Sequence, residues 1–167
     1  FFCHQQGDPD PQQVARWQQA LAPFYAKFGV STDAVSNGPS RAPFNAEHAA
    51  ILAEFNPAVV SFHFGLPAPE LLARVKATGA KVFASATTVA EAKWLARHGA
   101  DAIIAQGLEA GGHRGHFLNQ DLSLQQGTFT LLPQIVAAVD LPVIAAGGIV
   151  DGKGIKAALA LGASAVQ

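Results

Sequence analysis

Two glycine-rich segments hold the side chains of this sequence that could do chemistry. The first runs from Gln106 to His116 and contains four glycines in the nine residues 107–115. Glycine is costly in backbone entropy, so this density is typical of a loop whose backbone approaches a ligand or takes a positive φ. In it, His113 can exchange a proton near neutral pH without a large pKa shift, and His116 competes for that role. The segment indicates a ligand-binding loop with an acid–base group; a flexible surface loop is the alternative.

The second segment, residues 145–149, contains the pair Gly147-Gly148 between an apolar run and a helix expected to begin around Gly152. Unobstructed glycine amides, together with the positive end of a helix, can hold a phosphate without a basic side chain. A plain tight turn is the alternative. The order strand, Gly-Gly, helix favours the phosphate site, which barrel enzymes often build from their last two loops.

The sequence lacks the residue patterns of several other kinds of functional site. The histidines are not accompanied by carboxylates or cysteines in a ligand pattern, which argues against a metal site. No Gly-x-Gly-x-x-Gly run follows a strand and no Gly-Lys-Ser/Thr loop occurs, so dinucleotide-fold and P-loop enzymes fit poorly. His63 lies in an apolar run, where it either faces a ligand or is a core histidine, the interpretation we favour. The remaining histidines are expected to be structural or exposed: His4, His48 and His98.

An α/β scaffold must position the two segments. Short apolar runs, rich in β-branched or aromatic residues, occur at 58–64, 81–85, 101–105, 142–146 and 164–167. Their continuous hydrophobicity suits strands covered on both faces, as in a parallel sheet. A strand–helix unit of about twenty residues repeats, and one interval of roughly twice that length holds the first glycine-rich segment. This rhythm predicts a parallel α/β fold but does not separate a closed barrel from an open doubly wound sheet.

Helix signals fill the intervals between these runs. Thr88 and Glu91 form a predicted capping box, and further helices are expected to open at Pro69 or Glu70 and at Thr128. Left-handed glycines should end three helices, at Gly79, Gly99 and Gly162. Near the N-terminus, a cap and a first-turn proline precede apolar residues at helical spacing: Asp10, Pro11, then Val14, Trp17, Leu21, Phe24 and Phe28.

Composition restricts the class of protein. Half of the 167 residues are apolar, enough for a sizeable core in one domain. A net charge of −1, with 14% charged residues, leaves no broad basic face for nucleic acid or anionic lipid. No apolar run approaches the ~20 residues of a membrane span, no signal peptide opens the chain, and the lone Cys3 indicates no oxidising compartment, so we expect a cytoplasmic protein. Strand-like ends and the lack of methionine suggest an internal piece of a longer protein.

In this order, the motifs resemble those of a known family. Residues 60–65, 106–115, 142–149 and 159–163 are similar to the nitronate monooxygenase (2-nitropropane dioxygenase) family. The resemblance implies an α/β fold of the (β/α)₈ TIM-barrel type that binds FMN non-covalently. Residues 1–167 would form an incomplete barrel domain, about strands 4–7 plus the start of strand 8. It also implies an enzyme that oxidises alkyl nitronates or nitroalkanes with molecular oxygen, with these small molecules as partners, no nucleic acid, no membrane and an unknown oligomeric state.

Position by position, the resemblance implies that His113 is the catalytic residue. The implied flavin contacts are Gln106, Gly111, Gly112, Ala146, Gly147, Gly148 and Gln167. Ser85 occupies a strand-end position near the flavin ring, where some relatives carry lysine. The family's N-terminal Pro-Met loop and the Gly-Thr expected after Gln167 lie outside this sequence, which leaves open whether these residues alone bind FMN.

Two other functions stay open. An FMN-dependent enoyl-acyl-carrier-protein reductase of the same superfamily shares the motif at residues 109–113, although residues 114–117 and the polar stretch 119–126 favour the nitronate enzymes. A non-catalytic flavin- or phosphate-binding barrel would keep Gly147-Gly148 without using His113 as a base.

Overall fold

The computed structural model describes residues 1–4, 7, 9–31 and 42–167, which belong to two compact units. The larger unit comprises Phe1–His4 and Pro43–Gln167, and the smaller comprises Gln5–Ala42. A five-stranded sheet forms the centre of the larger unit: β1 (Val59–Phe62), β2 (Lys81–Ala86), β3 (Ala102–Gln106), β4 (Val143–Ala146) and β5 (Ala165–Val166). Each strand lies within or one residue beyond a run that the sequence predicts to be a strand.

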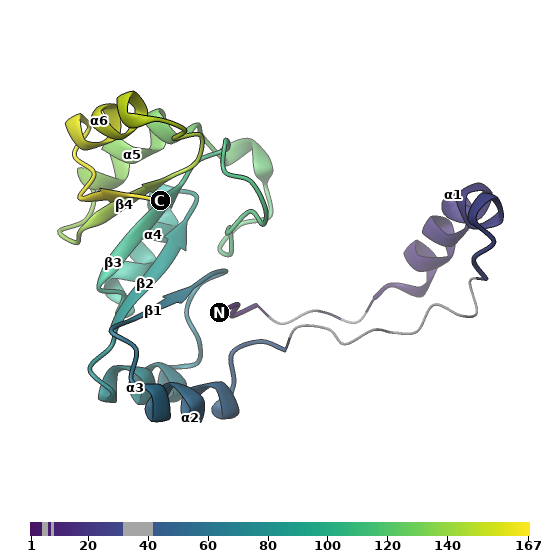
Figure 1. The fold of residues 1–167 in the computed structure, drawn as a ribbon, viewed down its shortest axis with the longest axis horizontal. Coiled ribbons are helices and arrows are strands. Elements are labelled where there is room, and N and C mark those ends of the chain that lie inside the picture. The colour runs from purple at the N-terminus through teal and green to yellow at the C-terminus, as the bar shows by residue number, and fades with distance from the viewer. Residues whose placement is uncertain (5–6, 8, 32–41) are drawn as a thin grey trace. The chain divides into compact units, whose positions relative to one another are not determined.

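Neighbouring strands of the sheet are consecutive in the chain. All four pairs are parallel and the order is β1-β2-β3-β4-β5 (Figure 1). A doubly wound sheet reverses its strand order at a switch point, whereas right-handed crossovers in unbroken order keep all helices on one face. The sheet is therefore part of the wall of a (β/α)₈ barrel, as the family resemblance predicts.

The helices of the larger unit follow the strands in alternation. They are α2 (Ala46–Phe55), α3 (Pro69–Ala77), α4 (Val89–Arg97), α5 (Thr128–Val136) and α6 (Gly152–Ala160), with a 3₁₀ turn at Leu122–Leu124. Helix α4 contacts β2 and β3, α5 contacts β3 and β4, and α6 contacts β5. The predicted starts at Pro69 and Thr128 are confirmed, and Gly79, Gly99 and Gly162 have the positive φ expected at the helix ends.

The sheet has one covered face and one open face. Side chains alternate along a strand, and the set that includes Phe62, Val82 and Ala145 is buried against the helices. The alternate set is exposed at the edges of the sheet, where Val59 at the start of β1 is 44% exposed, but its members in β3 are buried. The prediction that all strands are covered on both faces is therefore wrong for β1 and β5, because the helices described pack on one face only; β3 is buried throughout.

The predicted capping box at α4 is only half formed. The Thr88 hydroxyl accepts from the Glu91 amide at 3.2 Å, as expected for an N-cap. The Glu91 carboxylate does not return to the Thr88 amide. It accepts instead from the amide and hydroxyl of Thr87, each at 2.8 Å, because its side chain is directed into the protein, where it is 1% exposed.

The smaller unit contains α1 (Pro11–Phe28). Asp10 caps it by accepting from the Gln12 amide at 2.9 Å, and Gly29 ends it with a φ of 64°. The predicted cap and helix are confirmed. None of its residues is buried within this unit, and Trp17 is 67% exposed. Within the described residues, no helix is both long and apolar enough to cross a membrane.

Candidate functional site

Four predicted site residues lie at the carboxyl ends of the strands, on the face opposite the helices, where three are buried and Gln167 is exposed. Gln106 pairs with Ala146 across β3 and β4, and Ser85 pairs with Ile104, two residues before Gln106. The Gln167 amide donates to the Ala145 carbonyl at 2.9 Å, which continues this register to β5. Because side chains alternate along strands, Ser85, Gln106, Ala146 and Gln167 all point to the same side. Ligands of α/β barrels bind at this end of the strands.

The side chain of Gln106 holds in place the loop of residues 107–118, called the His113 loop below. Its Nε2 donates to the His113 carbonyl at 2.9 Å, and its Oε1 accepts from the Gly115 amide at 2.7 Å. Arg114 adds a second connection, since its guanidinium donates to the carbonyls of Gly107 and Leu108 at 3.2 and 3.1 Å. The backbone around His113 is thus held by side chains on both sides.

The imidazole of His113 is exposed and lies among aromatic rings. Its centroid is 5.0 Å from that of Phe2 and 5.9 Å from that of Phe64, which meets it edge-on at 89°. The backbone carbonyl, not the imidazole, makes the hydrogen bonds that hold the loop. The side chain is therefore accessible to a bound molecule and has an apolar flank.

His63, which the sequence left between a core and a ligand-facing position, lies beside this loop. It is half-buried, and its Nε2 is 3.3 Å from the His113 carbonyl oxygen. A carbonyl only accepts, so Nε2 carries the proton. Burial lowers the pKa of His63, opposed by this hydrogen bond, and the nearby His113 lowers it further. His63 is therefore a neutral hydrogen-bond donor that supports the His113 backbone, a role that depends on a contact fifty residues along the chain.

The two glycine-rich segments contact each other through Thr128. The Glu109 carboxylate accepts from the Thr128 amide at 2.8 Å, and the Thr128 hydroxyl is 2.9 Å from that carboxylate and 2.8 Å from the Gly147 carbonyl. A Cβ on Gly147 would lie 2.9 Å from the Ala110 amide nitrogen, and one on Gly148 would lie 2.9 Å from Glu109 Cβ. Both glycines also have positive φ, 120° and 68°. Close packing and backbone conformation thus require both glycines.

We expect acid to weaken this contact. Partial burial would raise the pKa of Glu109, but hydrogen bonds from the Thr128 amide, its own amide and the Thr128 hydroxyl, with the charge of Arg114, bring the pKa below its usual value. A carboxylate with a lowered folded-state pKa stabilises the fold above its unfolded pKa of about 4.3, and this contribution is lost as pH falls through the folded pKa. In urea unfolding, the stability difference between the wild type and Glu109→Gln should therefore shrink from pH 6 toward pH 3.

Glu70→Gln provides the control for losing one negative charge, because no hydrogen bond to the Glu70 carboxylate is found within the described residues. If the difference between wild type and Glu109→Gln stayed constant over this range, the Thr128 hydrogen bonds would not be what lowers the pKa of Glu109.

The start of α6, whose positive end was expected to add to the phosphate site, has a side-chain cap. The Asp151 carboxylate accepts from the amides of Lys153 and Gly154, both at 2.9 Å, so these two amides are occupied. Asp directly before a helix is the usual cap, so the sequence itself carried this signal. The amides of Gly147 and Gly148 have no acceptor within the described part of the chain, and they are the donors left for a phosphate.

Gly111 and Gly112 differ from Gly147 and Gly148, which are closely packed. Apart from the adjacent residues, no atom of the described chain lies within 4 Å of the position that a Cβ would take at either glycine, and Gly111 does not have a positive φ. Neither backbone conformation nor packing within the described chain requires glycine at 111, whereas a flat group lying against the backbone would. This open position, the free amides at 147 and 148 and the polar strand ends fit the FMN that the resemblance implies.

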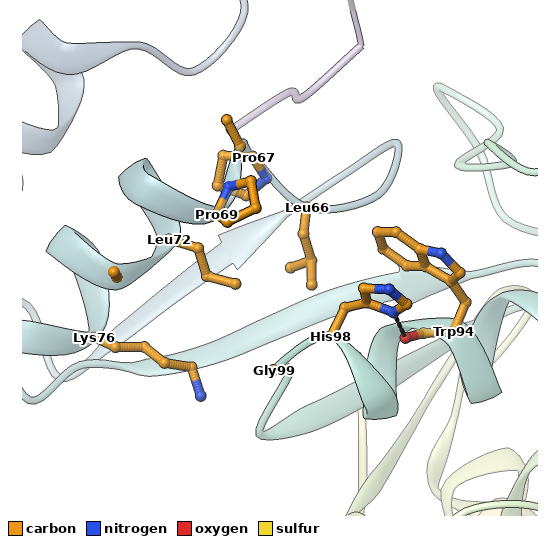
Figure 2. Close-up of a pocket in the computed structure, with 10 residues that line it drawn as sticks. Leu66, Pro67, Pro69, Leu72, Lys76, Trp94, His98 and Gly99 are labelled. Atoms are coloured by element: carbon orange, nitrogen blue, oxygen red, sulfur yellow. Dashed lines mark hydrogen bonds between the residues drawn. The ribbon is translucent and has the colours of Figure 1, made fainter.

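A cavity of about 600 Å³ lies elsewhere, on the helical side of the sheet (Figure 2). Leu66, Leu72 and Lys76 line it together with Trp94, whose ring stacks on His98 with centroids 3.9 Å apart. None of the predicted site residues lines this cavity, and we do not assign it to the candidate site.

The chain matches proteins of known family over almost its whole length. The family model described as nitronate monooxygenase matches residues 2–167. A nitronate monooxygenase of Paraburkholderia phytofirmans is 45% identical over 99% of this chain and 46% of its own length, and one of Pseudomonas aeruginosa is 42% identical over 100% and 48%. The crystal structure of nitroalkane oxidase from Streptomyces ansochromogenes superposes with a TM-score of 0.86 at 38% identity, covering 100% of this chain and 47% of that one. The chain spans about half the length of these relatives.

Proposed function

Because the chain belongs to the nitronate monooxygenase family, we propose that the complete protein oxidises alkyl nitronates or nitroalkanes with molecular oxygen in an FMN-dependent reaction. The observation that carries the proposal is that the predicted site residues share one rim of the sheet, formed by the carboxyl ends of its strands. This rim holds the polar residues at the strand ends, the two glycine-rich segments in contact with each other, and the accessible His113. Such a rim is where a barrel enzyme assembles its site.

In this proposal the backbone amides of Gly147 and Gly148 bind the phosphate of FMN. The open side of Gly111 and Gly112 borders its ring system, and Ser85, Gln106, Ala146 and Gln167 contribute from the strand ends. Bound FMN supplies the electron transfer between substrate and oxygen. The protein contributes orientation, exclusion of water and a proton-transfer group.

His113 is that proton-transfer group. As a neutral imidazole it accepts the α-proton of a nitroalkane, and as a donor it binds the oxygens of an anionic nitronate. The rings of Phe2 and Phe64 offer an apolar flank for an alkyl chain. Such a group typically contributes ~10²–10⁴-fold to the rate.

The test is oxygen uptake by the full-length, FMN-loaded protein with propyl-1- or propyl-2-nitronate. We expect saturable, substrate-dependent oxygen consumption. A yellow protein that is inert toward both nitronates would instead favour a non-catalytic flavin-binding barrel. Rapid bleaching by NADH without oxygen, followed by reoxidation with crotonyl thioester, would favour the enoyl reductase.

A further inference from the structure

The carboxylate of Glu91 is buried at the first turn of α4, where it accepts four hydrogen bonds. Its Oε2 accepts from the amide and hydroxyl of Thr87, each at 2.8 Å. Its Oε1 accepts from the amides of Phe117 and Leu118, at 2.7 and 3.2 Å. The residue is 1% exposed. One side chain thus joins the end of β2 to the far end of the His113 loop.

Among the residues that the structure describes, no basic side chain pairs with this carboxylate. Within the described residues, the ion pair found is the one between Lys76 and Asp101, at 3.5 Å. A buried charge is costly unless it is hydrogen-bonded, and hydrogen bonds to an ionised acceptor are roughly twice as strong as neutral ones. The four donors therefore take the place of a counter-ion, and two of them are backbone amides of the loop.

The ring of Phe117 is held at the same point. Trp94, one turn after Glu91 on α4, meets it edge-on with centroids 5.3 Å apart. A Cβ on Gly65 would lie 3.2 Å from the Phe117 ring, so the loop after β1 also packs against it. Two side chains thus hold the loop by hydrogen bonds: Gln106 binds the backbone of residues 113 and 115, and Glu91 binds the backbone of residues 117 and 118.

We propose that Glu91 is a positioning residue for the reaction. Its carboxylate anchors the C-terminal end of the His113 loop and thereby fixes the position of the His113 imidazole. The inference rests on the proposed role of His113. Only residue 116 separates the part of the loop that Gln106 binds from the part that Glu91 binds. A shift of the backbone at Phe117 is therefore expected to move the backbone that carries His113. A misplacement of about 1 Å can cost ~10²-fold in rate without any loss of a reacting group.

Glu91→Gln tests the anchor in the full-length, FMN-loaded protein. The amide keeps the size of the side chain but offers one acceptor oxygen instead of two, so one pair of donors loses its partner. We expect hydrogen exchange to rise at least about tenfold at the amide of 87 or at the amides of 117 and 118, whichever pair the remaining oxygen no longer serves, since their protection depends on these bonds. The kcat for a neutral nitroalkane should fall about 10–100-fold, while FMN affinity and KM change little. Glu70→Gln, an exposed acidic residue in the first turn of α3, is the matched control.

A double-mutant cycle with His113→Ala separates positioning from a merely structural role. If Glu91 acts through His113, Glu91→Gln should change kcat less than about twofold when His113 is already alanine. The same fold-loss in both backgrounds would overturn the proposal, as would unchanged exchange at all three amides, 87, 117 and 118. Full activity of His113→Ala alone would refute the proposed function of His113 and the positioning with it, so the two failures can be told apart.

Thr87 supplies a milder pair of variants in case Glu91→Gln does not fold. Thr87→Val keeps the shape and removes the hydroxyl donor, whereas Thr87→Ser keeps the donor. We expect faster exchange at 117 and 118 and a lower kcat in Thr87→Val only. Equal exchange rates and equal kcat in the two variants would contradict the proposal that Glu91 anchors the loop.

Discussion

Replacing His113 with alanine in the full-length, FMN-loaded protein should lower kcat for neutral nitroalkanes by about 10²–10⁴-fold and leave flavin binding intact. The loop is held through the His113 carbonyl, which Gln106 and His63 contact, and alanine keeps that carbonyl. The loss should be smaller for nitronates, because these are already deprotonated and need only a hydrogen-bond donor. The measurement is steady-state oxygen uptake with both substrate forms, together with the flavin absorbance of the purified variant.

Two further histidines serve as comparisons. His98→Gln changes a histidine on the helical side of the sheet, stacked on Trp94, and should leave turnover unchanged. His116→Ala changes the competing histidine of the same loop. If His113→Ala kept full activity and His116→Ala lost it, His116 would be the base.

Replacing Gly147 with alanine should destabilise the fold by about 2–5 kcal/mol. A non-glycine residue in a left-handed conformation costs roughly 1–2 kcal/mol, and insertion into a packed contact adds about 1–3 kcal/mol. The added Cβ would lie 2.8 Å from the Thr128 hydroxyl and 2.9 Å from the Ala110 amide nitrogen. Urea unfolding of flavin-free protein is the measurement, because a bound ligand adds to the apparent stability.

Gly111→Ala is the matched change in the other segment, and we expect the opposite pattern. The position is open and has no positive φ, so stability should stay within about 0.5 kcal/mol of the wild type. If FMN lies against this backbone, a methyl group there should weaken its binding about tenfold, equivalent to ~1.4 kcal/mol. Unchanged FMN affinity would remove Gly111 from the cofactor site, and normal stability of Gly147→Ala would contradict the packing of the two loops.

Much of the scaffold could be predicted from residues close together in the chain. Hydrophobic runs located all five strands. Asp10 and Thr88 cap helices as expected, and Gly79, Gly99 and Gly162 end them. These features depend on hydrogen bonds and burial within a few residues, so a local pattern determines them. The family resemblance likewise rests on contiguous motifs and is confirmed by a match over residues 2–167.

The strand order and the partners of the buried polar side chains were decided only by tertiary structure. A strand–helix rhythm is the same in a barrel and in a doubly wound sheet, and pairing between distant strands separates them. Glu91 had a local partner available at Thr88, yet it binds Thr87 and amides 26 and 27 residues away. Gly147 and Gly148 were interpreted through a ligand, but packing against Glu109 and Ala110 already requires them. When a polar side chain has several possible hydrogen-bond partners, its partner is the group that folding places beside it in the protein interior. That placement depends on contacts between distant parts of the chain, which a local sequence pattern does not contain.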